Sequence, residues 1–211
     1  MGRKSKFSQQ NLHYYSLFYG VNYFKASLFV AVSILIGIGV ALYRIADYES
    51  SSVIFKNGSW MSCKDLPLGK NDLLTAQITV FAPFTLSGEE AIYLFAQRDN
   101  EEVKLNSKND YIVEGNIHQI HAQYWSFTIY GKDFFLVPNK ENKYSVNNSN
   151  IRVDSLGNFS IIISQNEKQG NWLPSPDNTH FKLVLRIYRG EKDYVEHLDK
   201  ASLPEIKIMR Q

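Results

Sequence analysis

Residues 121–139 read HAQYWSFTIYGKDFFLVPN, and their pattern decides the fold expected for the chain. From Trp125 to Tyr130 apolar and polar side chains alternate, and a glycine then interrupts the run. Successive side chains of a β-strand point to opposite faces, so the alternation predicts a strand with one buried face. Ser126, Thr128 and Tyr130 fall on the second face, which is either the solvated side of a sheet or part of a binding site.

Six further runs are rich in aromatic and β-branched residues, as strands are. They are residues 91–97, 110–115, 143–146, 158–164, 181–188 and 204–209. Asn, Asp and Gly residues separate them, as expected for turns. Several short strands with no helix between them predict a mainly β protein, built as an antiparallel β-sandwich or barrel.

One short helix is expected before these strands. Leu74, Ile78 and Phe81 recur with helical spacing, and Pro83 ends the run. Asn71 or Asp72 can cap the first turn. Residues 45–57 are polar at their start and are expected to form a linker.

The strand at residues 181–188, FKLVLRIY, also has two different faces. Arg186 and Tyr188 lie on the face opposite to the leucines. If this strand shares a sheet with residues 124–130, then Ser126, Thr128, Arg186 and Tyr188 gather with Tyr130 on one face. These groups can hydrogen-bond a sugar, a carboxylate or a loop of a partner protein, so we take them as candidate binding residues.

The run NWLPSP at residues 171–176 is the most distinctive loop expected in the chain. Trp172 stands close to Pro174 and Pro176, which reduce the entropy lost when a loop becomes ordered. The tryptophan either packs as a plug at one end of the sandwich or offers an aromatic platform to a saccharide or peptide.

Residues 26–44 are expected to cross a membrane. Eighteen of them, ASLFVAVSILIGIGVALY, carry no charge and precede Arg44. As a helix they span roughly 27 Å, close to the roughly 30 Å hydrocarbon core of a bilayer. A cleaved signal peptide is the alternative, since Gly39 and Ala41 form a small-x-small pair, although its apolar region is usually shorter. A buried core helix fits such a length less well.

The charges before this segment predict its orientation. Residues 1–25 contain Arg3, Lys4, Lys6 and Lys25 and no acidic residue, and positive charge stays on the cytoplasmic side. The domains expected are a cytoplasmic basic N-terminus at 1–25, a transmembrane helix at 26–44, a linker at 45–57 and a periplasmic β-sandwich at 58–211. The localisation expected is therefore the inner membrane of a bacterium.

Small residues recur every four positions within the apolar segment, at Ser33, Gly37 and Ala41. This spacing allows two membrane helices to approach closely. A weak homodimer through these residues is therefore a hypothesis.

The sequence contains no complete set of residues for known chemistry. Its net charge of +2 does not indicate nucleic-acid binding, and its single cysteine leaves no disulfide within the chain. His118 and His121 lie three residues apart, but no further ligand completes a metal site, and glycine-rich cofactor loops are absent. We expect no metal and no cofactor.

Five runs in the chain resemble, in order, the motifs Y-W-S-x-T-x-Y, N-x-Y-S, D-G-S-x-x-I, N-W-L-P-x-P and F-x-L-x-L-R-x-Y of a bacterial family called domain of unknown function 1214. The runs lie at residues 124–130, 142–145, 157–163, 171–176 and 181–188. The resemblance covers roughly residues 58–208, and Gly157 and Asn158 depart from the family's Asp-Gly. It implies a jelly-roll-like β-sandwich, with a membrane anchor in short members, and it implies no established reaction.

The leading hypothesis is a membrane-anchored periplasmic module that binds an envelope protein or a saccharide. A second hypothesis is an envelope hydrolase or isomerase acting on a saccharide or lipid-derived substrate, with Glu90, Asp110 or His118 converging on Arg186. A third is a structural subunit that docks on a larger complex through Trp60 and the helix after residue 71.

Overall fold

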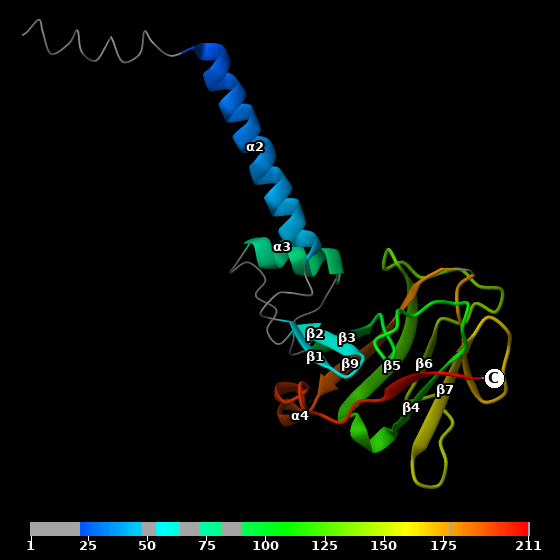
Figure 1. The fold of residues 1–211 in the computed structure, drawn as a ribbon. Coiled ribbons are helices and arrows are strands. Elements are labelled where there is room, and N and C mark those ends of the chain that lie inside the picture. The colour runs from blue at the N-terminus through cyan, green and yellow to red at the C-terminus, as the bar shows by residue number, and fades with distance from the viewer. Residues whose placement is uncertain (1–21, 48–53, 64–71, 82–89, 178, 211) are drawn as a thin grey trace, which may run out of the picture. The chain divides into compact units, whose positions relative to one another are not determined.

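The computed structural model describes residues 22–47, 54–63, 72–81, 90–177 and 179–210 (Figure 1). The chain divides after Ala46 into two units. The first contains one apolar helix, and the second is mainly β, with two sheets and two short α-helices.

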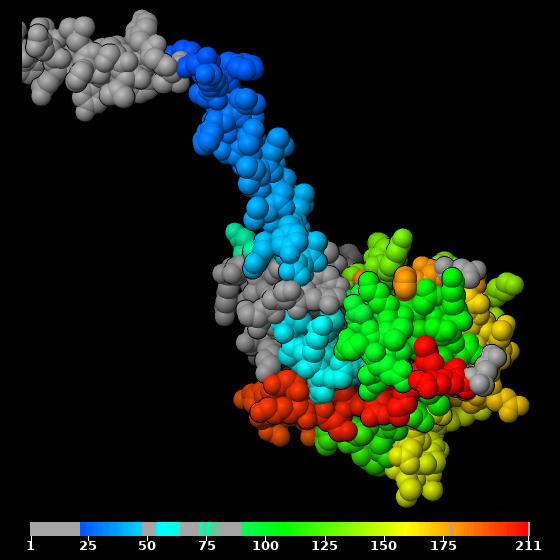
Figure 2. All heavy atoms as spheres, viewed as in Figure 1, coloured from blue at the N-terminus to red at the C-terminus, as the bar shows by residue number. Residues whose placement is uncertain are grey.

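Helix α2 (Tyr23–Ala46) forms the first unit and is slightly longer than the predicted segment 26–44. The Asn22 side chain caps it by accepting the backbone N–H groups of Phe24 and Lys25, at 3.2 and 3.3 Å. None of its residues is buried, and Figure 2 shows its side chains standing out around the rod. It is long and apolar enough to cross a membrane or to act as a signal sequence, and its exposure does not fit a core helix.

Among the described residues, the second unit contains ten strands in two sheets. Figure 1 shows how these strands are arranged. The larger sheet has the order β1 (Ile54–Asn57), β2 (Trp60–Cys63), β3 (Ala91–Ala96), β9 (Phe181–Gly190), β5 (Ala122–Gly131) and β6 (Ser145–Asn147). The smaller sheet has the order β10 (Glu205–Ile208), β4 (Tyr111–Asn116), β7 (Asn158–Ser164) and β8 (Asn171–Pro174). The helical segments are α3 (Asp72–Phe81), η2 (Ile117–Gln119) and α4 (Lys192–Glu196).

The seven strands predicted from the sequence are all present, as is the predicted helix, which is α3. Helix α4 was not predicted, because five residues are too short for a helical period to show. Two strands were also missed: β1 lies inside the predicted linker at residues 45–57, and β2 follows it closely. β1 and β2 form a hairpin across Gly58 and Ser59, in which Gly58 has a φ of 58°. Asn-Gly before a short apolar run is a hairpin signal, but four-residue strands show too little alternation to be recognised.

The expectation of a fully antiparallel fold was wrong at one pair of strands. β8 runs parallel to β7, with Ile161 opposite Asn171 and Ser164 opposite Pro174. The segment 171–174, expected as a loop, is therefore an edge strand. An edge position tolerates Pro174 because only one side of the strand needs backbone N–H groups.

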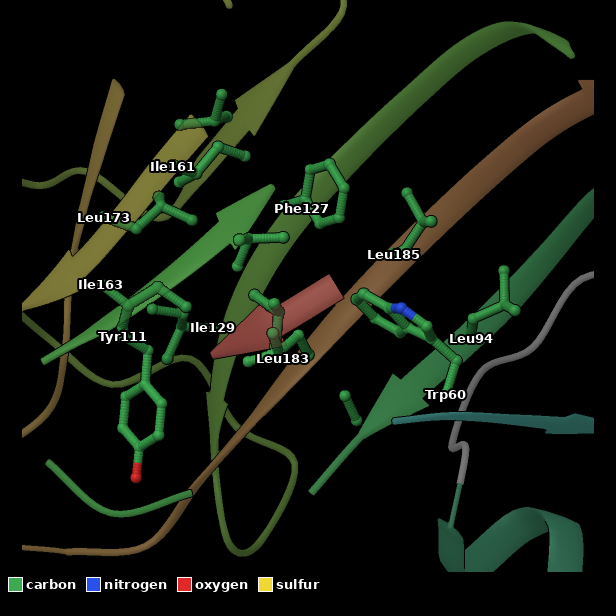
Figure 3. Close-up of a cluster of buried hydrophobic side chains, with 14 of the residues drawn as sticks. Trp60, Leu94, Tyr111, Phe127, Ile129, Ile161, Ile163, Leu173, Leu183 and Leu185 are labelled. Carbon is green, nitrogen blue, oxygen red and sulfur yellow. The ribbon is translucent and has the colours of Figure 1, made fainter. Parts of the chain in front are cut away.

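The two sheets share one hydrophobic core. Phe127, Leu183 and Leu185 of the larger sheet belong to the same cluster of buried side chains as Ile161 and Ile163 of the smaller one. Figure 3 shows these side chains filling the space between the strands of the two sheets. The apolar face of residues 124–130 therefore packs inward, as the alternation of these residues predicts.

Phe127 tests this core directly. Its side chain is fully buried, and its ring centroid lies 6.0 Å from that of Trp60 and 5.9 Å from that of Phe159. We expect Phe127→Ala to lower the free energy of unfolding by about 3–5 kcal/mol, because it leaves a cavity between the sheets. Urea unfolding of the full chain in detergent, followed by tryptophan fluorescence, measures this change. Leu156→Ala, at a side chain that is 73% exposed, is the control and should change stability by less than about 0.5 kcal/mol. Equal effects of the two substitutions would contradict this account of the core.

Candidate functional site

The second face of the larger sheet, turned away from the shared core, gathers most of the predicted site residues. We call it the outer face. Strand β5 lies beside β9, with Ser126 opposite Arg186 and Tyr130 opposite Lys182. Residues opposite each other in an antiparallel pair share a face, so the sequence prediction that these polar groups come together is confirmed. Tyr188 and Thr128 extend the same face in the same register.

The centre of the outer face is buried. Ser126 and Thr128 are each 4% exposed. Beside them a second, smaller hydrophobic cluster contains Met61, Phe95 and Val184. The simple alternative from sequence, a face wetted by solvent, is therefore wrong at its centre. β2 and β3 bring apolar side chains to this face, and single-strand alternation cannot reveal that.

Arg186 is the principal charged group of the outer face. Its guanidinium carbon lies 5.3 Å from the centroid of the Tyr130 ring, which is a cation–π distance. Its Nε atom is buried and has no hydrogen-bond partner, and Arg186 forms no ion pair with the residues that the structure describes. Burying a donor of a charged group without an acceptor is costly. A guanidinium in this state is suited to receive a carboxylate or a phosphate.

Tyrosine rings line the face beside Arg186. The ring centroid of Tyr188 lies 6.5 Å from that of Tyr93 and 5.7 Å from that of Tyr124, at steep interplanar angles. Tyr124 is 38% exposed, so this row of rings reaches the surface. Tyr93 and Tyr124 were missed as site residues. Tyr124 has the same strand parity as Ser126 and was recognisable, whereas Tyr93 joins the site only through the pairing of β3 with β9.

Lys182 is a second cation of the outer face that was not among the predicted site residues. It is only 8% exposed, and its Nζ atom lies 3.1 Å from the centroid of the Phe134 ring. Burial lowers the pKa of the Lys182 amine to about 8, although the nearby negative charge of Asp133 acts in the opposite direction. Its position was recognisable, because it has the same strand parity as Arg186.

Trp172 lies apart from this group of residues, on β8 of the smaller sheet. It is 3% exposed, its Nε1 atom donates to the Ser164 carbonyl at 3.0 Å, and the Lys143 amine lies 5.4 Å from the centre of its ring. A ring so covered supports the structural interpretation, a packed plug, over an open platform.

Asp110 and His118, named for the enzyme hypothesis, and Trp60, named for docking, lie away from the outer face. Asp110 precedes β4 and forms an ion pair with Lys168 at 3.1 Å, and His118 lies in η2 at the other end of β4. Neither lies on the sheet that carries Arg186. Trp60, proposed as a docking residue, is 1% exposed and donates its Nε1 hydrogen to the Pro204 carbonyl, so it is a core residue.

Fold and face together define a mainly β protein with an N-terminal apolar helix and an arginine- and tyrosine-lined sheet surface. Residues 90–192, from β3 to the start of α4, match the family described as Protein of unknown function (DUF1214). This match confirms, over residues 90–192, the resemblance of the chain's motifs to that family. The matched segment contains every residue of β5 and β9 on the outer face.

Two solved structures are similar to the chain. The VPA0106 protein from Vibrio parahaemolyticus is 29% identical, with a TM-score of 0.55 over 65% of this chain and 35% of that one. An uncharacterized protein from Burkholderia cenocepacia is 15% identical, with a TM-score of 0.42 over 80% of this chain and 40% of that one. This chain thus spans about a third of the length of the Vibrio protein. No curated protein matches it significantly.

The lowered pKa of Lys182 predicts how stability depends on pH. Between about pH 8 and pH 10.5 the amine is protonated more fully in the unfolded chain than in the folded one, so this residue makes stability rise with pH. We expect wild type to gain stability relative to Lys182→Met as pH is raised from 7.5 to about 10. Thermal unfolding of both proteins across this range measures the difference. Parallel pH profiles would show that burial does not perturb this amine.

Proposed function

We propose that this is a single-pass protein of the bacterial inner membrane, with residues 1–25 in the cytoplasm and a periplasmic β-sandwich of jelly-roll topology at residues 58–211. The exposure of α2 along its whole length supports a helix surrounded by lipid. The absence of acidic residues before it, against four basic ones, supports a cytoplasmic N-terminus. Two sheets that share one core support the sandwich.

Reporter fusions test this topology. We expect alkaline phosphatase fused after Gln211 to be active and green fluorescent protein at the same position to be dark, because the C-terminus is exported. We also expect the mass of the protein purified from membranes to include residues 26–44, since an anchor is retained and a signal peptide is removed. Fluorescence confined to the cytosol would contradict the orientation, and a chain shortened after residue 41 would contradict the anchor.

The function we propose is binding: the outer face holds a ligand or partner of the cell envelope. The observation that carries this proposal is Arg186, whose buried Nε donor lacks an acceptor beside the Tyr130 ring. The hydrogen-bond donors of a structural arginine are normally paired with neighbouring acceptors. The Nε donor of Arg186 has no such acceptor among the described residues, which supports a ligand or partner that supplies one. The partly exposed row of tyrosines beside it supplies flat apolar surface with polar tips.

This chemistry fits two kinds of envelope molecule. A saccharide can stack its C–H face on a tyrosine ring and direct an acidic group at the guanidinium, and a loop of an envelope protein can do the same with an aspartate or glutamate. Self-association of α2 through Ser33, Gly37 and Ala41 stays a prediction. Within one chain a Cβ atom at Gly37 would meet nothing within 4 Å, so the position leaves room for a second helix.

Site-specific photocrosslinking tests the outer face. We expect a benzophenone amino acid at Tyr124 to form an adduct in living cells, because this exposed position borders the proposed site. We expect Arg186→Met to reduce the adduct about tenfold or more, as loss of a charge-assisted contact does. The same crosslinker at Leu156 is the matched control for surface exposure. An adduct at Tyr124 that Arg186→Met leaves unchanged would remove Arg186 from the site.

A further inference from the structure

Two cations flank the middle of the outer face. On β9, Lys182 and Arg186 point to the same side because they are four residues apart in a strand. Their Cα atoms are therefore separated by roughly 13 Å. The charged group of Arg186 lies nearer to Lys182 than this Cα separation suggests. Its guanidinium contacts the ring of Tyr130, and Tyr130 is the residue opposite Lys182. Between the two cations lies the buried hydroxyl residue Thr128, opposite Val184.

Neither cation forms an ion pair within the described part of the chain. Lys182 is more than nine-tenths buried, and among the described residues its amine makes its close contact with the Phe134 ring. The Asp133 carboxylate acts on it at longer range, and one of its oxygens accepts the Phe135 backbone N–H at 3.2 Å. Two buried or half-buried cations on one face, neither of them in an ion pair with a described residue, indicate a place for a negatively charged group.

The residue that covers Lys182 is held in a strained conformation. Phe134 has a φ of 64°, in the left-handed region that a bulky residue rarely adopts, at a cost of order 1–3 kcal/mol. The turn that holds it is tight: the Gly131 backbone N–H donates to the Phe135 carbonyl at 2.9 Å, and a Cβ at Gly131 would come 2.8 Å from Asp133 Oδ1. The ring also packs against Phe95, 5.8 Å between centroids. Such strain is found where a residue has a functional position to keep.

We infer that the outer face binds a carboxylate or phosphate between Lys182 and Arg186, and that the Phe134 ring covers the lysine when no ligand is present. This inference rests on the proposed binding function and names the chemistry of the ligand. The anion accepts hydrogen bonds from the Lys182 amine and the guanidinium, and the tyrosines contact the remainder of the molecule. An acidic sugar and a phosphorylated headgroup or sugar share this chemistry.

Titration calorimetry of the full chain in a polyoxyethylene detergent tests the inference with three small probes: galacturonate, glycerol 3-phosphate and galactose. We expect millimolar binding of at least one of the two anions and binding of galactose about tenfold weaker or worse. Which of the two anions binds more tightly separates a carboxylate source from a phosphate source. Failure of both anions to bind, to wild type and to Phe134→Gly alike, would overturn the inference.

Three substitutions assign the parts of the site. Lys182→Met and Arg186→Met should each weaken anion binding about tenfold, whereas Lys132→Met, which removes an exposed charge from the same turn, should not. Phe134→Gly should tighten binding several-fold, because glycine accepts the positive φ and no ring covers the amine. Anion binding that is unchanged in Lys182→Met would overturn the role of the lysine, and unchanged or weaker binding in Phe134→Gly would overturn the covering role of the ring.

These experiments distinguish failure of the anion site from failure of the proposed binding function. A Tyr124 crosslink that depends on Arg186 but survives Lys182→Met, without anion binding in vitro, would leave a binding face and remove only the anion site. Loss of the crosslink in both variants is the result expected when both proposals are correct.

Discussion

The antiparallel pairing of β5 with β9 is the constraint on which the rest of the structure depends. It runs from Ala122 opposite Gly190 to Gly131 opposite Phe181, through the middle of the larger sheet. Because side chains alternate along both strands, this one register sends Phe127 and Leu185 into the shared core and Ser126 and Arg186 to the outer face. A slip of one residue would exchange the two faces, so core and candidate site are fixed by the same hydrogen bonds.

The outer face combines features that rarely occur together in a sheet that serves only as support. Its centre is buried from solvent like a hydrophobic core, yet the face contains hydroxyl groups, an arginine and a lysine. Burial of the Arg186 Nε donor without an acceptor costs free energy, and the chain also holds Phe134 in an unfavourable backbone conformation beside the lysine. Under the proposed binding function such costs would preorganise a site, because a ligand that supplies an acceptor for Arg186 gains what the unliganded protein lacks.

The family match bears on which part of the molecule the proposed binding function would use. The matched segment, residues 90–192, contains the outer-face residues of β3, β5 and β9 and excludes the N-terminal helix. The Vibrio protein is longer, and this chain covers 35% of it. A similar fold thus occurs both in this chain and in a larger protein. A binding module is consistent with such use in different architectures.

The sequence by itself determined the elements whose signal is local. Period-two alternation located β5 and β9 and separated their faces, eighteen uncharged residues located α2, and the parity of Ser126 and Tyr130 identified the polar side of the strand. Only the tertiary structure decided what each face contacts. It paired β3 with β9 and so added Tyr93, placed Trp172 on the other sheet, and buried Trp60 in the core. Strand pairing and burial depend on residues distant in sequence, and the period of a single strand contains no information about them.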